Sequence, residues 1–588
     1  MFAAMRNRKH DSKRATQITP SDAEEPRLRC RGFVLEVGHE GLSGDEAIAL
    51  AERVERETVG TDWRVEPFGR TERGSPGTQS AHREFALRRA DGADVPVADA
   101  WDIVRMIRAH RSVSCAEPSF DHAGLAPPPD GLDRWLTANE RHKIKKGILA
   151  QKRTAAVPSK DWSVRAVRAD AAWERMRRAG HAAPGRGIVI GHPDTGYSRH
   201  PAIWSGERGR MRIGNGYDFL DRHRDPTDPL NEAPEFPGHG TATAGVMIGG
   251  GDSGVSGIAP FAEVVPFRVS RTAFHLGFEE VACAIEHAVA VGCHVIALCL
   301  GGPVRSAFLH RAVRRAVDAG VIVVAASGDY WPWVVYPARF DEVIAVTAMN
   351  SRDRVWRFAT SGSSVDLAAP GEDVWVASAK PGGSFGTEPA SGTSFAAAAV
   401  AAAAALWLDY HGRRALLARY GTKRLPIVFK ESLVHSGVRT PKRWDTKRHG
   451  AGILDIERLL AAELPDAAPA RGFAATRPSE RPRVVSDIEE LHRLAPGGAS
   501  AVTRSRIARL LNVRDAELAT ALAPHADEIA FHLMTSPVWR EVIAARPLAG
   551  VRGNVPRLDA FAERVNPFER LAQIATVSKT LRGAILGT

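Results

Sequence analysis

GIVIGHPDTG (residues 187–196) joins a short apolar run to a carboxylate that follows it closely. Continuous Val and Ile runs, rather than alternating ones, are typical of strands buried on both faces of a sheet. A carboxylate at the carboxyl end of a parallel strand lies at the sheet edge where active sites form, and Gly196 lets the chain turn sharply there. Taken alone, Asp194 is more often a turn residue or a helix cap. The stretch therefore predicts a buried strand and a candidate functional carboxylate.

Similar apolar runs recur between residues 161 and 464 and alternate with helical stretches. Such a pattern predicts an α/β fold with a doubly wound, mostly parallel sheet and helices on both faces. The further runs are EVVPFRV (263–269), HVIALCL (294–300), VIVVAAS (321–327) and EVIAVTA (342–348).

Two more motifs in this region contain residue types that can act as a general base and as a nucleophile. GHGTATAGV (238–246) places His239 between two glycines, which keep both sides of the ring open. SGTSFAAAAVAAAAALWL (391–408) places Ser394 at the start of an Ala-rich helix. The positive end of the helix dipole favours the negative charge that develops on an attacked carbonyl oxygen. A lone His is more often structural, and a Ser here is often an ordinary N-cap. The joint occurrence of all three motifs favours catalysis.

Together these motifs resemble the subtilisin-like serine proteases. The chain order Asp, His, Ser is the order of that family, and Asp194, His239 and Ser394 are separated by 45 and 155 residues. The resemblance implies a catalytic triad. Ser394 attacks the peptide carbonyl, His239 takes and returns the proton, and Asp194 orients the imidazole. An acyl-enzyme follows, and no cofactor is required.

Further strings extend the resemblance across residues 161–464. LCLGG (298–302) resembles the strand that lines the substrate cleft, where a peptide adds as an extra strand. VAASGD (324–329) resembles the wall of the main specificity pocket and the oxyanion hole. Trp331 and Trp333 are expected to narrow an otherwise open, apolar pocket. GVSGIAP (254–260), YPA (336–338), SSVDLAAPGEDVW (363–375) and GAGILDIERLL (450–460), the last as a closing helix, also fit. The implied substrate-binding residues are Leu300, Gly301, Gly302, Ala325, Ala326 and Ser327.

Two departures from the family pattern affect the expected chemistry. The oxyanion hole would consist of the Ser394 N–H and residue 329, and this chain has Asp329 where the family usually has Asn. An ionised carboxylate cannot donate, and losing one such donor typically costs about 10²–10³ in rate. A protonated Asp329 still donates, so we expect slow or acid-favoured hydrolysis. The second departure, Phe395–Ala399 in place of Met-Ala-x-Pro-His, indicates a divergent member.

Residues 28–120 read as strand, helix, strand, strand, helix, strand, which is the ferredoxin-like split βαβ order. The strands are FVLEV (33–37), WRVEPF (63–68), REFALRR (83–89) and SVSCAEP (112–118), with helices around 47–54 and 98–110. The size and order resemble the family's propeptide, an intramolecular chaperone and inhibitor. An unrelated ferredoxin-like module is the alternative. Residues 1–27 read as a disordered tail, and residues 121–160 as a linker that would be the cleavage region.

The C-terminal part follows a second linker at residues 465–482 and is helical in pattern. SDIE (486–489) is a capping-box start for residues 483–588. RSRIARLLNVRDAELATAL (504–522) admits a helix-turn-helix interpretation, although an ordinary pair of packed helices is the more common case. This region either binds a partner or covers the catalytic domain.

Composition excludes several other classes of protein. The 588 residues carry a net charge of +11, but arginines are spread along the chain without interleaved aromatics, so nucleic acid is not an expected partner. Five cysteines without CxxC spacing argue against a disulfide framework or a structural zinc site. NGYDFLDRHRDPTD (215–228) has carboxylates but lacks calcium-loop spacing. We therefore expect no metal and no cofactor; the resemblance leaves calcium open, because members of the family often bind it.

The N-terminus lacks the apolar stretch of a secretory signal, and no apolar run is long enough for a membrane span. A cytoplasmic location is the default expectation, and a misassigned start codon leaves secretion open. The leading hypothesis is a serine endopeptidase acting on polypeptide substrates. The alternatives are an impaired relative that binds peptides or partner proteins and, with little weight, a nucleic-acid-binding protein. The oligomeric state and the physiological substrate are not specified by the sequence.

Overall fold

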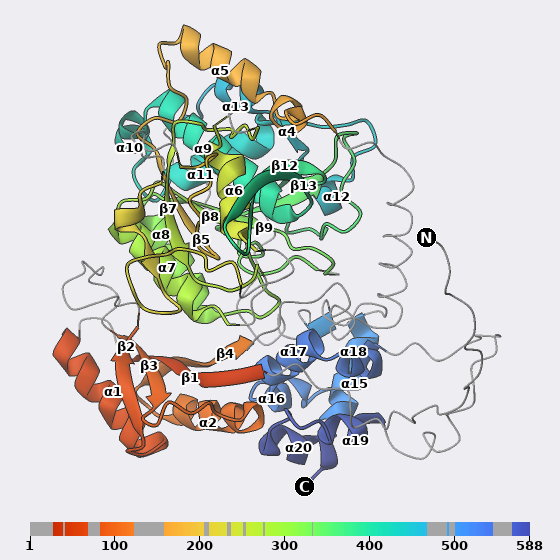
Figure 1. Cartoon of the computed structure of the whole chain (residues 1–588). Helices are drawn as coiled ribbons and strands as arrows, with labels where there is room; N and C mark the ends of the chain where they lie inside the picture. Colours follow the sequence, from red (N-terminus) through yellow and green to blue (C-terminus); the bar gives the residue numbers. More distant parts are fainter. Residues whose placement is uncertain are drawn as a thin grey trace, which may run out of the picture.

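The computed structural model describes residues 28–38, 42–68, 83–122, 158–204, 211–231, 237–250, 254–273, 277–331, 333–466, 491–492, 500–544 and 567–588. These residues form an N-terminal α+β unit, a large central domain and a C-terminal group of helices (Figure 1). The predicted tail, most of both predicted linkers and the SDIE motif lie outside the described residues.

The N-terminal unit has the predicted order of elements. It consists of β1 (Leu28–Val37), α1 (Gly44–Thr58), β2 (Trp63–Pro67), β3 (Glu84–Arg89), α2 (Val97–Ala109) and β4 (Val113–His122). Its antiparallel sheet has the order β2-β3-β1-β4. Strand β1 begins five residues before the predicted FVLEV, because a register shift between Cys30 and Phe33 hides the earlier part from a period-two pattern.

The central domain is built on a nine-stranded sheet with the order β14-β15-β11-β10-β9-β8-β5-β7-β6. The pairings from β6 through β15 are parallel, and β14 joins the edge antiparallel. The predicted α/β class is confirmed. The strands are β5 (Val189–Asp194), β6 (Tyr217–Asp218), β7 (Glu263–Arg268), β8 (Val295–Leu298), β9 (Ile322–Ala326), β10 (Ile344–Met349), β11 (Leu367–Pro370), β14 (Val438–Arg439) and β15 (Ile453–Leu454).

Helices cover both faces of this sheet. Helices α7 (Glu279–Ala290) and α8 (Ala307–Asp318) pack in one apolar cluster, and the remaining helices except α12, which has no buried residue, pack in another. The remaining helices are α4 (Trp162–Ala166), α5 (Ala169–Arg178), α6 (His239–Ile248), α9 (Thr393–His411), α10 (Arg413–Tyr420), α11 (Leu425–His435), α12 (Thr446–His449) and α13 (Ile456–Ala461). A hairpin of β12 (Val374–Lys380) and β13 (Ser384–Ala390), which the sequence did not predict, lies beside α6 (Figure 1).

Helix α9 is the central helix of the domain. Its Ala-rich surface is narrow, so it packs closely against several strands, and all its residues from Thr393 to Leu408 are buried. Among the described residues it is the one helix whose length and composition would also allow a membrane crossing. Because 89% of that apolar stretch is buried inside the domain, a core helix accounts for its composition.

Two predicted boundaries in the central domain are wrong. Strand β5 is not confined to the apolar run GIVIG (187–191), which the pattern predicts as the strand, but runs through His192 and Pro193 to Asp194, in parallel register with β7. The closing segment 450–460 is not helical throughout, because Ile453 and Leu454 form β15 before α13 begins. In both places pairing with a neighbouring strand outweighs the local pattern.

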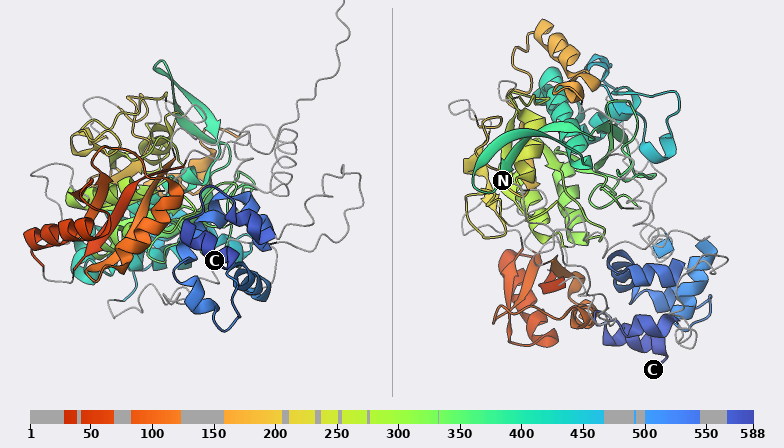
Figure 2. Two further views of the ribbon diagram at one scale, coloured as in Figure 1. Left: turned by 90° about the horizontal axis from the view of Figure 1, so that it is seen from below. Right: turned by 45° about the vertical axis from the view of Figure 1, so that its right-hand side comes forward.

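The C-terminal helices surround an apolar core of their own. They are α15 (Ser500–Leu510), α16 (Leu518–Leu522), α17 (Ala526–Thr535), α18 (Pro537–Ala544), α19 (Pro567–Ala572) and α20 (Lys579–Leu586). Leu510, Leu518 and Leu522 are fully buried in this core, which fits the packed-pair interpretation of residues 504–522. All three views place these helices beside the N-terminal unit and next to the central domain (Figures 1 and 2).

Candidate active site

The carboxylate of Asp194 and the imidazole of His239 are directly bonded. Asp194 ends β5, His239 begins α6, and His239 Nδ1 lies 2.7 Å from Asp194 Oδ1. The close approach depends on Gly240, because a Cβ there would lie 2.1 Å from the carbonyl oxygen of Gly196. The pair is almost completely buried, with 1% of Asp194 and 6% of His239 exposed.

Their electrostatics suit a base with an ionised partner. Burial acts to lower the pKa of His239, but the charge of Asp194 and its hydrogen bond outweigh it, and the pKa is raised. Burial likewise acts to raise the pKa of Asp194, but the charge of His239 and the hydrogen bonds from His192 and His239 leave it lowered. Asp194 is therefore ionised wherever the protein is folded near neutral pH.

Ser394 lies in the first turn of α9, close to this pair. The ring of its neighbour Phe395 has its centroid 6.5 Å from that of His239. Ser394 is 7% exposed, and its hydroxyl donates to the carbonyl oxygen of Cys299 at 2.6 Å. Cys299 directly follows β8 and lies within the predicted peptide-binding segment 298–302.

Asp329 contacts the same end of α9. Its Oδ1 accepts hydrogen bonds from the Thr393 N–H at 2.9 Å and the Thr393 hydroxyl at 2.7 Å. The hydroxyl hydrogen is committed to Asp329, because Thr393 Oγ1 itself accepts from the Gly328 N–H at 3.2 Å. Burial raises the pKa of Asp329, and the two bonds from Thr393 oppose that rise without cancelling it.

The predicted substrate residues fall into two groups. Leu300, Gly301 and Gly302 follow β8, and Gly302 exchanges backbone bonds of 2.9 and 2.8 Å with Tyr336. The other group consists of side chains buried in the sheet core, 3% exposed or less, and their role in substrate binding stays a prediction. These residues are Ala325, Ala326 and Ser327.

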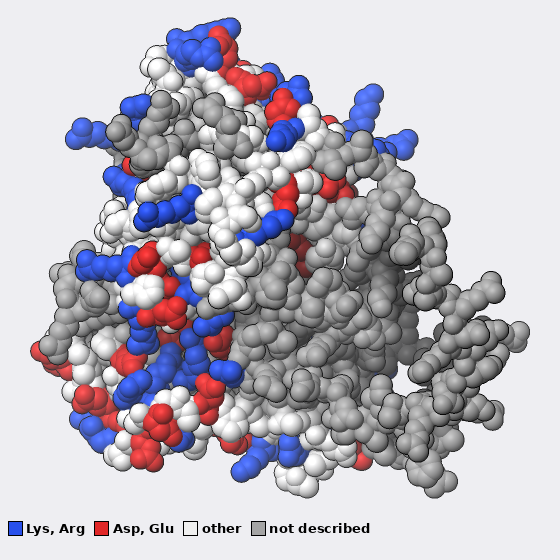
Figure 3. Space-filling view, in the orientation of Figure 1, with Lys and Arg blue, Asp and Glu red and all other residues white. Residues whose placement is uncertain are grey.

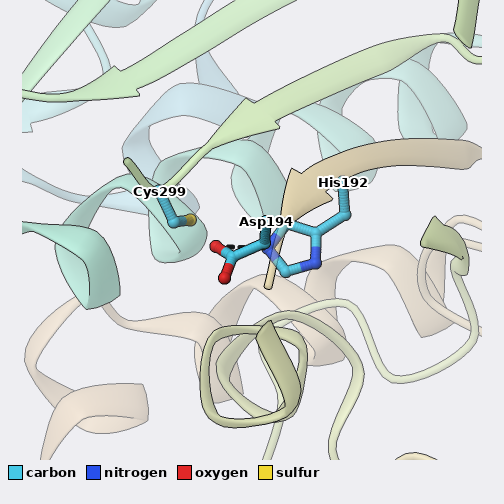
Figure 4. A group of neighbouring side chains, drawn as sticks. All are labelled: His192, Asp194 and Cys299. Carbon is cyan, nitrogen blue, oxygen red and sulfur yellow. Dashed lines mark ion pairs between the residues drawn. The ribbon is translucent and has the colours of Figure 1, made fainter. Parts of the chain in front are cut away.

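Two clusters among the described residues have the composition of a metal site. The first contains His192, Asp194 and Cys299, all buried (Figure 4). Asp194 is already committed to His239. Burial raises the pKa of Cys299 well above that of an ordinary thiol, which disfavours the thiolate that metals bind. This cluster is therefore better suited to hydrogen bonding.

The second cluster contains Asp218, Asp221 and His223. The guanidinium of Arg268 lies between its carboxylates, with Nη1 2.6 Å from Asp218 and 2.6 Å from Asp221. A fixed positive charge thus lies between the carboxylates of this cluster, which disfavours a cation there.

Sequence reasoning missed His192, Thr393 and Arg268. His192 stands two places before Asp194, and alternate residues of a strand share a face, so its position was a usable signal once β5 was known to reach Asp194. Thr393 and Arg268 gave no such signal, because their partners are remote in sequence.

The fold and this site define a serine-type hydrolase. Residues 185–433 match the model of the subtilase family. The intracellular serine protease of Paenibacillus polymyxa is 34% identical over 251 residues, which are 41% of this chain and 71% of that one. Thermitase of Thermoactinomyces vulgaris is 33% identical over 261 residues, 44% of this chain and 85% of its own.

A solved structure extends the likeness in fold. Fervidolysin of Fervidobacterium pennivorans, a keratinolytic enzyme related to subtilisin, covers 75% of this chain and 62% of its own with a TM-score of 0.52 and 18% identity. The chain belongs to the subtilase family and is a serine-type endopeptidase.

Proposed function

We propose that Ser394 is the nucleophile, His239 the general base and Asp194 the orienting carboxylate of this endopeptidase. The observation that carries the assignment is the 2.7 Å bond between a buried imidazole and a buried carboxylate, beside the first turn of α9. His239 takes the Ser394 proton as the hydroxyl attacks and returns it to the leaving amine. Water then releases the acyl group.

The bond from Ser394 to Cys299 gives substrate binding a part in activating the nucleophile. An extended peptide that pairs with the segment after β8 would use the Cys299 carbonyl as an acceptor for its own N–H. That exchange displaces the Ser394 hydroxyl, which a side-chain rotation brings to His239. The oxyanion would then accept a hydrogen bond from the Ser394 N–H and, when Asp329 is protonated, a second one from its carboxyl group.

Labelling with a fluorophosphonate probe tests the assignment, because the probe reacts only with an activated serine. We expect the wild-type chain to be labelled, and expect Ser394→Ala and His239→Ala to remain unlabelled. Cleavage of a peptide library by the wild type and Ser394→Ala across pH then identifies the preferred residues. Equal labelling of the wild type and Ser394→Ala would refute the assignment.

The second candidate function is a catalytically impaired protein that binds peptides through the same cleft. Asp329 is the observation that favours it, because an ionised carboxylate at this place repels an oxyanion. Peptide binding without labelling or turnover at any pH between 4 and 9 would establish this alternative.

The N-terminal unit is proposed to be the intramolecular chaperone and inhibitor of the central domain. It contacts the N-termini of two helices on one face of the sheet. Arg88 and Ser119 bind Glu279, the first residue of α7. Glu117 accepts from Ser306 and from the Ala307 N–H at 2.9 Å, where α8 begins.

Further ion pairs between the two units surround these contacts, and each unit contributes both basic and acidic side chains to them. Glu84 binds Arg311 at 2.7 Å and Arg315 at 3.0 Å, and Arg31 binds Glu280. On the face shown in Figure 3, basic and acidic side chains are intermixed over this region. Each of the carboxylates named here, Glu84, Glu117, Glu279 and Glu280, thus meets a cation or a helix N-terminus of the other unit, as expected of units that fold against each other.

Mass spectrometry of the purified chain tests self-processing. We expect the wild type to lose the N-terminal unit by cleavage within residues 121–160, and expect Ser394→Ala to keep it. An identical, unprocessed mass for both chains would remove the self-processing proposal while leaving the triad assignment untouched.

A further inference from the structure

A second imidazole lies against the carboxylate of the triad. His192 is on β5, two residues before Asp194, and 1% of it is exposed. Figure 4 shows its ring beside the Asp194 carboxylate, with Cys299 on the other side. His192 Nε2 lies 3.4 Å from Asp194 Oδ2 and 3.1 Å from Thr243 Oγ1.

The two oxygens of Asp194 differ in how they are satisfied. Oδ1 receives His239 Nδ1 at 2.7 Å and the Thr195 N–H at 2.7 Å. Oδ2 is buried and forms no hydrogen bond of regular geometry with any described residue. His192 Nε2 lies 3.4 Å from this oxygen. Because an unpaired buried oxygen of a carboxylate is costly, this contact is important for keeping Asp194 ionised.

Thr243 determines which nitrogen of His192 carries the proton. Its Oγ1 lies 3.0 Å from the carbonyl oxygen of His239 and 3.2 Å from that of Gly240. When either carbonyl takes the single hydroxyl hydrogen, a lone pair of Oγ1 is left toward His192 Nε2. In that arrangement Nε2 carries the proton, and its hydrogen lies between Thr243 Oγ1, 3.1 Å from Nε2, and Asp194 Oδ2, 3.4 Å from Nε2.

We propose that His192 is a positioning residue for peptide hydrolysis, a role that rests on the proposed triad. Its Nε2–H holds Oδ2 of Asp194, so that Oδ1 keeps its direction toward His239. It also withdraws part of the carboxylate charge from His239. His192 does not contact substrate, and it acts only through Asp194.

The charged and titratable groups around His192 come from several elements. Asp194 shares its strand, His239 is on α6, and Cys299 follows β8. The guanidinium of Arg268 on β7 is directed to Asp218 and Asp221 instead. A pH effect of changing His192 must therefore act through Asp194 and His239.

His192→Leu, His192→Asn and His192→Gln together test the proposal. Leu removes the donor, Asn keeps an amide that is too short to reach Oδ2, and Gln places an N–H near the position of Nε2. A hydrogen bond to a charged group commonly contributes a factor of about 10–100. We expect Leu and Asn to lower kcat/KM by about that factor, mainly through kcat, and Gln to restore most of it.

The pH profile distinguishes positioning from mere structural support. Without the His192 donor, the undivided charge of Asp194 stabilises the His239 imidazolium more, so the acid limb of kcat/KM moves to higher pH in His192→Leu and His192→Asn. Gln returns the limb to the wild-type position. Equal labelling rates and an unmoved limb in all three variants, with the wild type labelled, would overturn this proposal alone. An unlabelled wild type would overturn the triad assignment.

A separate set of contacts joins the C-terminal helices to the N-terminal unit. Phe531 of α17 stacks on Phe120 of β4 with ring centroids 4.6 Å apart, and contacts Trp101 of α2 at 5.4 Å. The buried Glu528 binds Arg105 of α2.

The same two units are joined at the start of α20. Asp102 of α2 accepts the N–H groups of Lys579 and Thr580 at 3.0 and 3.3 Å. A carboxylate at a helix N-terminus is favoured by the dipole and by the free N–H groups there. The contact between the C-terminal helices and the N-terminal unit, at α17 as well as at α20, is thus specific in charge and shape.

The C-terminal helices also contact the central domain. Their apolar core includes Trp333, with Trp331 and Val304 packed against it. Trp331 follows Asp329 by two residues, and Val304 follows the predicted peptide-binding segment. One unit therefore contacts both partners of the N-terminal interface.

We infer that the C-terminal helices are a latch that holds the N-terminal unit on the central domain. Hydrogen exchange of the full chain, in the Ser394→Ala background, tests this inference. Phe531→Ala should speed exchange by about tenfold or more in β4 and in the first turn of α8, because the interface opens more often. Asp515→Ala, which removes an exposed ion pair with Arg504 inside the C-terminal unit, is the matched control. Unchanged exchange at β4 and α8 in Phe531→Ala would refute the latch.

Discussion

Asp329→Asn is expected to increase activity, and the structure determines why. Oδ1 of Asp329 accepts both hydrogen bonds from Thr393, at 2.9 and 2.7 Å. In the variant the amide oxygen takes this acceptor position, since the NH₂ group cannot accept. The NH₂ group is then left at the position of Oδ2, where it donates to the oxyanion at every pH. The substitution adds a permanent donor without disturbing the anchor.

The magnitude follows from the protonation of Asp329. Burial raises its pKa above that of an ordinary carboxyl, so the donating, protonated form persists to higher pH than usual and is lost as pH rises through that raised pKa. The base must be neutral, and the raised pKa of His239 means that activity falls as pH drops through a value above the usual one. The wild type therefore has its donor mainly where its base is already protonated. Because one oxyanion donor contributes about 10²–10³ in rate, we expect a gain of about 10²-fold at pH 8–9, shrinking toward acid pH.

The assay is kcat/KM for a peptide substrate from pH 5 to pH 9, with the concentration of active sites set by fluorophosphonate titration. Asp318→Asn, at the exposed end of α8, is the matched control and should leave the profile unchanged. Thermal unfolding should show similar stability for the three proteins, because the Thr393 bonds remain. A rate and a pH profile in Asp329→Asn that equal those of the wild type would refute the reasoning.

Three further substitutions test the framework around the site. Trp407→Ala empties the largest buried side-chain position in α9 and should lower the free energy of unfolding by about 3–5 kcal/mol, measured by denaturant titration in an inactive background. Arg268→Ala leaves Asp218 buried without its guanidinium and should cost about 3–5 kcal/mol in the same measurement; a loss below ~1 kcal/mol would contradict the buried pair. Gly240→Ala places a Cβ 2.1 Å from the Gly196 carbonyl oxygen, so α6 must move and the probe-labelling rate should fall at least about tenfold while the fold persists. An unaltered labelling rate would show that α6 tolerates the shift.

The sequence predicted the fold where local pattern and packing agree. Continuous apolar runs gave the core strands because burial on both faces leaves no alternation, and the Ala-rich run gave α9. The prediction from sequence failed where pairing between strands determines the bounds of an element. Strand β5 extends through His192 and Pro193 because β7 lies beside it in register. The seven residues of the largely exposed β13 do not alternate between apolar and polar, so no sequence pattern predicted this strand.

The candidate site was predictable in its main residues and less so in their partners. Asp194 and His239, predicted from motif order, do bond to each other. Their surroundings depend on contacts between distant segments, such as the bond from Ser394 to Cys299 across 95 residues. Arg268, on a different strand, pairs with the carboxylates of Asp218 and Asp221. Local sequence spacing argued against a calcium loop there, but it could not identify this arginine as the partner of the two carboxylates.

Two carboxylates near one imidazole show how environment assigns roles to identical groups. Asp194 receives N–H donors from His239 and faces His192, so its charged form is stabilised and its pKa is lowered. Asp329 accepts hydrogen bonds from Thr393, and burial outweighs them, so its pKa is raised. The two environments push the pKa values of the carboxyl groups apart, which is the arrangement that lets one act as an anion and the other as a donor. Under the proposed mechanism, exchange of either role slows the reaction: a neutral Asp194 no longer supports the imidazolium, and an ionised Asp329 repels the oxyanion. The pH dependence of this endopeptidase should therefore report Asp329 and His239 as its two titrating groups, with Asp194 ionised throughout.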